Sequence, residues 1–87
     1  IKADLCIMGT NAIDTECITD TDLEAVQVKK AMIKASKRSA VVTISEKLGS
    51  TQKLQVCELS DIDYLVTDLP ADAPQFLGYR REGLVIL

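Results

Sequence analysis

Two short segments of this sequence carry groups that can bind an anion or a sugar. Gly9-Thr10-Asn11 follows an apolar run and offers backbone amides and small donors, of the kind that hold phosphate oxygens or sugar hydroxyls. Lys47 follows a second apolar run, where its ammonium can meet a phosphate or a carboxylate as a point charge. Glycine after a strand is also ordinary turn chemistry, and a loop lysine is more often only a surface residue. Both interpretations stay open for each segment.

Carboxylates near these segments can likewise have a ligand-binding role or only a structural role in a turn. Asp14 lies in the loop that follows Asn11, where it can accept sugar hydroxyls or serve as a general base, or else form an Asx turn. Thr67-Asp68, at the end of a third apolar run, can contact a ligand or cap the next turn. The chain has no histidine, and its serines and cysteines lack any apparent base partner. The sequence therefore predicts no catalytic triad.

The cysteines indicate neither a disulfide framework nor a metal site. Cys6, Cys17 and Cys57 are an odd number, without C-x-x-C spacing and without histidines to complete a metal set. We expect the cysteines to be small buried hydrophobic residues of a protein in a reducing compartment, the cytoplasm, and we expect no metal or cofactor. The sequence shows no signal peptide and no apolar stretch that approaches about 20 residues, so membrane spanning has no support.

Composition limits the fold and the partners. The chain has 87 residues, enough for one small domain, and it is 47% hydrophobic but only 3% aromatic. These values fit a core of aliphatic side chains between helices and a sheet. The net charge of −3 leaves no basic face broad enough to neutralise phosphates along DNA. These residues alone should therefore not bind DNA.

The first half of the chain predicts the elements that position the first segment. Ala3–Gly9 is a nearly continuous apolar run, typical of a strand buried on both faces. A polar loop, Thr10–Asp20, follows it. Thr21–Glu24 fits a capping box at the start of a helix that runs to about Arg38. A helix between two buried strands predicts the βαβ crossover of a parallel sheet.

The predicted helix has an apolar stripe and a basic face. The stripe and the face follow from a period of 3.6 residues, and the basic side chains near the carboxyl end suit the helix dipole. We expect the lysines to be a solvated face, with nucleic-acid contact as the less favoured alternative. The stripe comprises Ala25, Val28, Met32 and Ala35, widened by Val26 and Ile33, and the outward residues are Lys29, Lys30, Lys34 and Lys37.

The second half predicts the rest of an open α/β layer with four strands and two helices. In such a sheet a ligand sits outside the carboxyl ends of the parallel strands, which is where the candidate residues fall. The expected elements are a strand over Ser39–Ile44, a short edge strand or loop over Lys53–Leu59, a core strand over Asp63–Thr67, a short helix from Pro70–Pro74 to Gly83, and a final strand over Leu84–Leu87.

The first predicted strand needs a neighbour on each side. Ala3–Gly9 carries almost no polar positions, so burying it and pairing its backbone takes partners on both edges. The economical interpretation is that these 87 residues are the later part of a larger domain.

Several segments together resemble the C-terminal effector domain of DeoR-type transcriptional repressors. Val28–Ile33 resembles the family's V-K-R-A-M-I, and Ser45-x-Lys47-x-Gly49 resembles S-S-K-F-G after a strand. Leu59–Asp68 resembles L-S-x-I-D-x-L-I-T-D. The start of the chain, Ala3–Thr19, is similar to the family's A-D-x-x-x-x-G, G-I-D and G-L-T elements. The order and spacing of these pieces, spread over nearly the whole chain, carry the resemblance.

The resemblance implies a fold and a function. The fold would be Rossmann-like, of the ribose-5-phosphate isomerase, glucosamine-phosphate deaminase and CoA-transferase type, with these residues as the later part of one effector-binding domain. The effector would be a phosphorylated sugar, and operator DNA would be bound only by a separate amino-terminal helix-turn-helix domain. We also expect a homo-oligomer. The residues that would bind the ligand are Gly9, Thr10, Asn11, Asp14 and Lys47.

Three functions are compatible with these residues. A regulator's effector module, without enzyme activity, is the leading hypothesis. A sugar-phosphate isomerase fragment with Asp14 and Lys47 as catalytic residues is the second. Ile44 counts against it, because it stands where the family has an aspartate before Ser-x-Lys, and so do Ala25 and Gln27, which stand where acidic residues are common in the family. Ala12 and Cys17 replace loop glycines, which can change the path of the loop. The third is a structural module that self-associates through a strand edge and keeps only a vestigial pocket.

Overall fold

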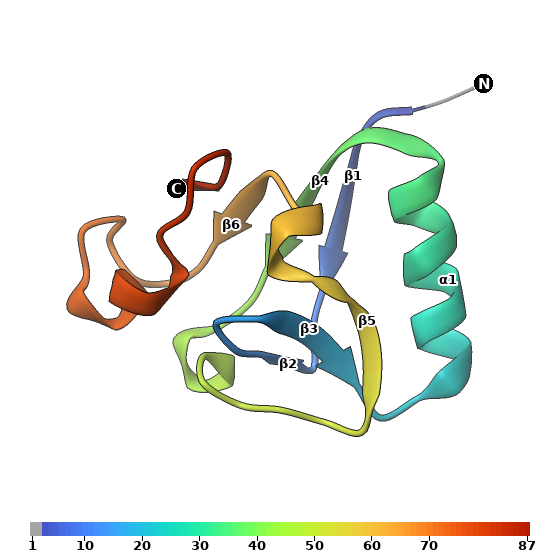
Figure 1. Cartoon of the computed structure of the whole chain (residues 1–87), viewed down its shortest axis with the longest axis horizontal. Helices are drawn as coiled ribbons and strands as arrows, with labels where there is room; N and C mark the ends of the chain where they lie inside the picture. Colours follow the sequence, from blue (N-terminus) through green and yellow to red (C-terminus); the bar gives the residue numbers. More distant parts are fainter. Residues whose placement is uncertain (1–2) are drawn as a thin grey trace.

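The chain folds into two sheets and one α-helix, described by a computed structural model over residues 3–87 (Figure 1). The four-stranded sheet has the order β1-β4-β6-β7 with every pair parallel, and the three-stranded sheet has the antiparallel order β2-β3-β5. The expected α/β class with a mainly parallel sheet is confirmed. In chain order the elements are β1 (Ala3–Gly9), β2 (Ala12–Ile13), β3 (Cys17–Asp20), α1 (Leu23–Lys34), β4 (Ser36–Val42), the 3-10 turn η1 (Ser45–Lys47), β5 (Leu54–Glu58), η2 (Leu59–Asp61), β6 (Tyr64–Val66), η3 (Pro74–Tyr79) and β7 (Val85–Ile86).

The core lies between the parallel sheet, α1 and the smaller sheet. β1 and β4 are parallel neighbours joined through α1, as the crossover pattern predicts. α1 contacts β4, β5 and β3, so it closes one side of the molecule (Figure 1). The most completely buried side chains come from six different strands and turns, and they are Phe76, Ile13, Ile18, Leu59, Leu65 and Val41.

The helix is shorter than the sequence predicts. Asp22, not Thr21, is its N-cap, and the Asp22 carboxylate accepts hydrogen bonds from the amides of Glu24 and Ala25. The helix ends at Lys34 rather than near Arg38, and the next strand begins at Ser36 rather than Ser39. The cause is strand pairing, because residues 36–38 lie opposite residues 3–5 of β1 and use their backbone groups there.

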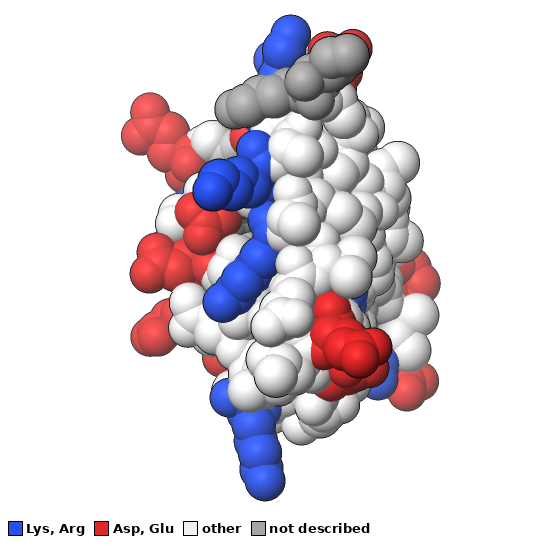
Figure 2. All heavy atoms as spheres, turned by 90° about the vertical axis from the view of Figure 1, so that its right-hand side faces the viewer, with Lys and Arg blue, Asp and Glu red and all other residues white. Residues whose placement is uncertain are grey.

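The buried face of α1 is also rotated relative to the prediction. Val26 is 3% exposed and forms the centre of the buried face, whereas Val28 is 58% exposed. Lys29, predicted to face solvent, is partly buried and forms an ion pair with Asp20 at 2.9 Å. Figure 2 shows the result, an uncharged strip along the outer side of α1 with a column of basic side chains beside it. No helix among residues 3–87 is long and apolar enough to cross a membrane.

The segment predicted as a polar loop, Thr10–Asp20, contains two short strands instead. β2 and β3 pair with each other, and β3 pairs with β5 as the central strand of the smaller sheet. Lys53–Leu59 was open between an edge strand and a loop, and β5 is an edge strand. Strands of two and four residues are too short for periodicity to reveal, so only tertiary pairing defines them.

The last predicted helix is a 3-10 turn that stops before Gly83. η3 begins at Pro74 and ends at Tyr79, and Gly83 instead forms a separate turn with a φ of 89° ahead of β7. Phe76 is fully buried, and its ring meets that of Tyr79 edge to face with the centroids 6.5 Å apart. The turn therefore inserts two aromatic rings into the core.

One face of the parallel sheet is bare in the described part of the chain. β1 was predicted to be buried on both faces, which is wrong here: Cys6 and Met8 point into the core, but Leu5 and Ile7 are 44% and 61% exposed. α1 covers only one side of the sheet, and among residues 3–87 β1 has a strand partner, β4, on one edge only. The exposed apolar face is completed by Val42, Tyr64, Val66, Val85 and Leu87.

We expect Phe76→Ala to destabilise the fold by about 3–5 kcal/mol, because it removes a fully buried ring and leaves a cavity. Leu77→Ala is the matched control, since Leu77 in the same turn is 78% exposed, and it should change the free energy of unfolding by less than about 0.5 kcal/mol. Urea denaturation of both variants measures the difference. Equal losses would show that η3 does not anchor the core.

Candidate functional site

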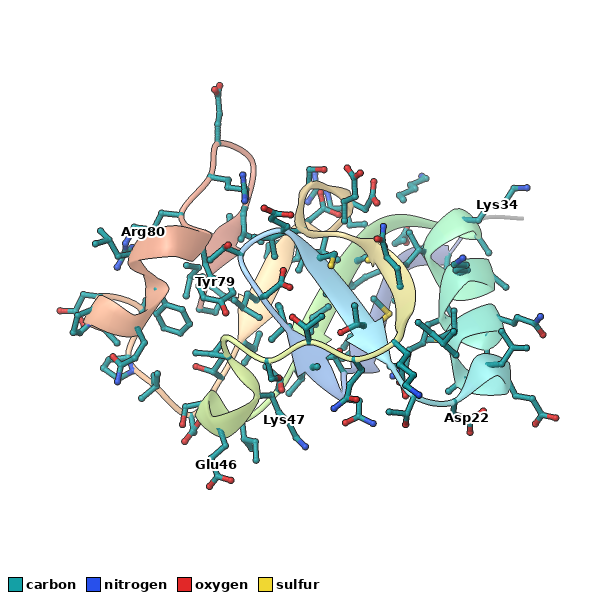
Figure 3. All side chains as sticks on the ribbon, turned by 60° about the horizontal axis from the view of Figure 1, so that its bottom comes forward. Asp22, Lys34, Glu46, Lys47, Tyr79 and Arg80 are labelled. Carbon is teal, nitrogen blue, oxygen red and sulfur yellow. The ribbon has the colours of Figure 1, made fainter. Side chains whose placement is uncertain are left out.

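The two segments that the sequence singles out lie side by side at the carboxyl edge of the parallel sheet. The contact runs through Ile13, whose carbonyl oxygen accepts hydrogen bonds from the amides of Gly49 at 2.8 Å and Ser50 at 3.2 Å. Ile13 also forms an isolated parallel bridge with Leu48. The loop after β1 and the loop that contains Lys47 are therefore joined. Figure 3 shows the molecule with this edge turned forward and Lys47 labelled.

Thr10 and Asn11 are tied to the end of β3. The Thr10 hydroxyl donates to the carbonyl oxygen of Ala12 at 2.8 Å. The Asn11 side-chain amide donates to the Thr21 hydroxyl at 3.3 Å and lies 3.5 Å from an Asp20 carboxylate oxygen. These contacts fix the direction in which the chain leaves β1.

The backbone conformation at position 9 does not require a glycine. It ends β1 opposite Val42, and its φ is not in the left-handed region. A methyl group built there would meet only the Val42 carbonyl oxygen, at an ordinary 3.8 Å. Any need for glycine at this position must come from something that approaches the loop, not from the fold.

Asp14 forms the Asx turn that was the alternative to a ligand role. One carboxylate oxygen accepts from the amides of Glu16 at 2.7 Å and Cys17 at 2.8 Å, and the other accepts from the Thr51 hydroxyl at 2.8 Å. The hydrogen bond from the Cys17 amide, helped by the others, lowers the pKa of Asp14. A carboxylate held this way is a weak base, and a ligand hydroxyl would have to share its oxygens.

Lys47 ends the turn η1, which Asp68 holds in place. The Asp68 carboxylate accepts hydrogen bonds from the Ser45 amide at 2.6 Å and from the Ser45 hydroxyl at 3.1 Å. The hydrogen bond from the amide is the main reason that the pKa of Asp68 is lowered. Asp68 therefore caps a turn, which was one of its two predicted roles. Lys47 is partly exposed, and its side chain points away from the ribbon at this edge (Figure 3).

A buried carboxylate that sequence reasoning missed organises the loop behind Asn11. Asp20 is 5% exposed and pairs with the Lys29 ammonium at 2.9 Å. It also accepts from the amides of Thr21 and Asp22. The hydrogen bond from Lys29 is the main reason that the pKa of Asp20 falls to about 2. No local sequence pattern predicts this ion pair, because its two residues are nine positions apart and lie at the end of a strand and in a helix.

Tyr79 is the second functional candidate that the sequence did not single out. Its hydroxyl accepts from the Gly49 amide at 2.6 Å and donates to the Ile13 carbonyl oxygen at 3.2 Å. Burial raises the pKa of Tyr79, so the hydroxyl keeps its proton. Sixty-six residues separate Tyr79 from Ile13 in the sequence, and no spacing rule connects them.

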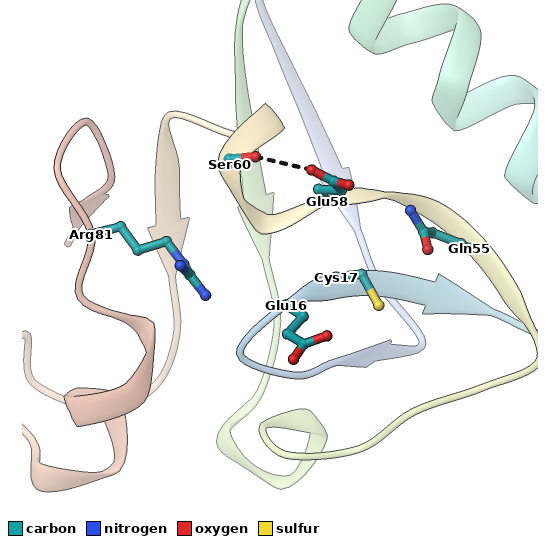
Figure 4. A pocket seen from close by; sticks show the side chains of 6 residues that line it. All are labelled: Glu16, Cys17, Gln55, Glu58, Ser60 and Arg81. Atoms are coloured by element: carbon teal, nitrogen blue, oxygen red, sulfur yellow. Dashed lines mark hydrogen bonds between the residues drawn. The ribbon is translucent and has the colours of Figure 1, made fainter.

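A hollow of about 300 Å³ lies elsewhere, beside the smaller sheet (Figure 4). It contains none of the five predicted residues. Glu16 and Glu58 bring two carboxylates to it, while the Arg81 guanidinium already donates to the Thr15 carbonyl oxygen. An anionic ligand would therefore meet net repulsion. The lining residues are Glu16, Cys17, Gln55, Glu58, Ser60 and Arg81.

The three cysteines are free in this fold. Burial raises the pKa of Cys17 and raises that of Cys57 to about 12, so both stay protonated and weakly reactive. Across the described range, residues 3–87, no group of three or more metal-ligating side chains gathers.

A family model described as the DeoR C-terminal sensor domain matches residues 1–69. The glycerol-3-phosphate regulon repressor of Haemophilus influenzae is 33% identical over 87 residues, which cover 98% of this chain and 34% of the relative. The HTH-type transcriptional regulator GlpR of Haloferax volcanii is 32% identical over 97% of this chain and 33% of its own length.

The HTH-type transcriptional repressor GlcR of Bacillus subtilis is 38% identical over 80% of this chain and 28% of its own length. The chain thus spans about a third of the length of the curated relatives it matches. No solved structure matches it significantly.

The Asp20 carboxylate should make stability depend on pH. Its pKa is lowered from 3.8 to about 2 on folding, so its contribution is present above pH 3.8 and is lost as the pH falls through the folded value. We expect a loss on the order of 1 kcal/mol over this window after allowance for solvent screening. Urea denaturation at several pH values measures it.

Asp20→Asn should flatten the pH dependence in that window, whereas Asp72→Asn, which changes an exposed carboxyl, should leave it as in the parent protein. Parallel curves for the parent and Asp20→Asn would contradict the role given to the Asp20–Lys29 pair.

Proposed function

This chain belongs to the DeoR family, in its C-terminal sensor domain, and on that premise we propose that it is the effector-sensing part of a transcriptional repressor. The effector is a phosphorylated sugar or a similar small phosphorylated polyol. The observation that supports this most directly is the joining of the loops after β1 and β4 at the carboxyl edge of the sheet, where α/β folds bind ligands.

The two loops divide the work of binding. Lys47 supplies a cation for the phosphate or a sugar oxygen. Gly9, Thr10 and Asn11 supply the close backbone approach and small donors, and Gly9 leaves room because no atom other than the Val42 carbonyl oxygen lies within 4 Å of the position of a β-carbon. Asp14 accepts sugar hydroxyls at the rim while it keeps its turn. The name of the Haemophilus influenzae relative, a glycerol-3-phosphate regulon repressor, supports a ligand of this class.

Binding of the effector controls DNA binding by a distant part of the protein. The effector favours one arrangement of the sensor domain, and a separate helix-turn-helix domain of the full-length cytoplasmic protein senses the change. Such coupling needs only that the effector bind the two arrangements with different affinity. The relatives named as HTH-type regulators support this division of labour. The net charge of −3 on these residues is consistent with a domain that does not itself bind DNA.

An enzyme role receives no support from the geometry. The isomerase alternative needs Asp14 as a base, and its carboxylate is engaged by two amides and a hydroxyl that lower its pKa. Ile44 is apolar and 49% exposed at the position where the family has an aspartate. We therefore propose a sensor without turnover.

The bare sheet face supports the proposal that residues 1–87 are the later part of one larger sensor domain. Parallel sheets are normally covered on both faces. Here Leu5, Ile7 and Val42 are exposed on the side opposite α1, and the relatives are about three times as long as this chain. Further chain of the same domain would cover this face. The alternative, association of two copies through the face, fits a homo-oligomer and is tested by comparing the size of the full-length protein in solution with and without Ile7→Lys.

Lys47→Ala should abolish effector binding in the full-length protein. Glycerol 3-phosphate and glucose 6-phosphate are the first ligands to test, with inorganic phosphate as a control, and thermal unfolding is the readout. We expect one of the two to stabilise the parent by about 2 kcal/mol at saturating excess and Lys47→Ala to lose that effect. The loss follows from removing the one positive charge among the five proposed residues.

Lys34→Ala is the matched control, because Lys34 is exposed and ends α1, next to the amino end of β4 and away from this edge. It should respond to the ligand as the parent does. If neither ligand, nor a wider panel of sugar phosphates, shifted a parent protein that is folded and binds DNA, the sugar-phosphate assignment would be wrong.

A further inference from the structure

We infer that Tyr79 is a positioning residue of this site: its buried hydroxyl sets the spacing between the loop that carries Gly9 to Asp14 and the loop that carries Lys47. The inference rests on the proposed function for the identity of the site. It concerns a residue outside residues 1–69, the part of the chain that the family model matches.

The hydroxyl touches both loops at their point of contact. It accepts from the Gly49 amide at 2.6 Å and donates to the Ile13 carbonyl oxygen at 3.2 Å. Gly49 itself donates to the same carbonyl oxygen at 2.8 Å, so the three groups form a closed triangle. Ile13 lies between Asn11 and Asp14, and Gly49 follows Lys47 by two residues. Any change in this triangle therefore moves the candidate groups of one loop relative to those of the other.

The Tyr79 side chain is held in place by the packing of the η3 turn. Tyr79 is 3% exposed and ends the η3 turn, whose Phe76 ring lies edge to face against the tyrosine ring. Figure 3 shows the Tyr79 side chain reaching from η3 toward the strands and loops that carry the site. The turn places only this hydroxyl at the junction, so its contribution is to position the two loops rather than to touch the ligand.

Gly49 needs the support more than most residues would. Its φ of 76° lies in the left-handed region, and no atom lies within 4 Å of the position of a β-carbon. A flexible residue without side-chain packing depends on its backbone hydrogen bonds to stay in place. Tyr79 and Ile13 provide those bonds, two residues from the ammonium-bearing Lys47.

Tyr79→Phe tests the inference because it removes the hydroxyl and keeps the ring. The fold should survive, since the Ile13 carbonyl oxygen retains the amides of Gly49 and Ser50, and the Gly49 amide retains Ile13. Tyr64→Phe is the matched control. Its hydroxyl accepts from the Arg38 guanidinium at 3.2 Å, and Tyr64 begins β6 at the opposite end of the strands.

Hydrogen exchange in the full-length protein gives the first readout. In Tyr79→Phe the amides of Gly49 and Ser50 should exchange about tenfold faster, while those of β4 stay protected, because only the local junction loosens. Tyr64→Phe should leave Gly49 and Ser50 unchanged. Unchanged exchange at Gly49 and Ser50, or an equal increase at every protected amide, would overturn the inference.

Affinity for glycerol 3-phosphate and glucose 6-phosphate gives the second readout, measured by calorimetry well below the melting temperature. Tyr79→Phe should weaken binding about tenfold, because the two loops lose their fixed spacing, whereas Tyr64→Phe should leave the affinity as in the parent. Unchanged affinity in Tyr79→Phe, or an equal loss in Tyr64→Phe, would show that Tyr79 is only structural. If the parent binds neither ligand nor any member of a wider panel of sugar phosphates, the proposed function fails, and the exchange result alone decides whether Tyr79 holds the loops.

Discussion

The carbonyl oxygen of Ile13 is the point on which the arrangement of this molecule depends. It belongs to a fully buried residue and accepts hydrogen bonds from the amides of Gly49 and Ser50 and from the hydroxyl of Tyr79. Three parts of the chain that are distant in sequence meet there: the loop after β1, the loop after β4 and the η3 turn. A buried carbonyl without donors would be costly, so these segments are held together by the need to satisfy it.

The same requirement explains why a candidate site lies at this edge. The parallel pairing of β1 with β4 brings both strand ends to one side, and the Ile13 junction then sets the separation of the loops that follow. Polar side chains near the edge serve the loops themselves: Asp14, Asp20 and Asp68 each satisfy backbone amides. The groups left to meet a ligand are those the fold does not fully use, above all the Lys47 ammonium and the open space beside Gly9.

Elements with strong local signals could be predicted from the sequence, and long-range contacts could not. β1 was predicted with the correct bounds, Ala3–Gly9, and the crossover to a parallel β4 was correct, because long apolar runs and a helical period are local properties. The predicted inward face of α1 was correct for Val26, Met32 and Ile33. It was wrong for Val28, which is exposed, and for Lys29, which pairs with the buried Asp20 carboxylate. The tie between Ile13 and Tyr79 has no signature in spacing or composition, since it arises only when the η3 turn packs into the core.

The most direct test of the whole account is a hydrogen-exchange footprint of the full-length protein with and without a sugar phosphate that it binds. A ligand at the carboxyl edge should slow exchange in two separate segments, residues 9–14 and 45–50, with little change around the hollow lined by Glu16, Glu58 and Arg81. Protection confined to that hollow, or to the bare sheet face around Ile7, would contradict it, because the ligand would then lie away from the carboxyl edge of the sheet.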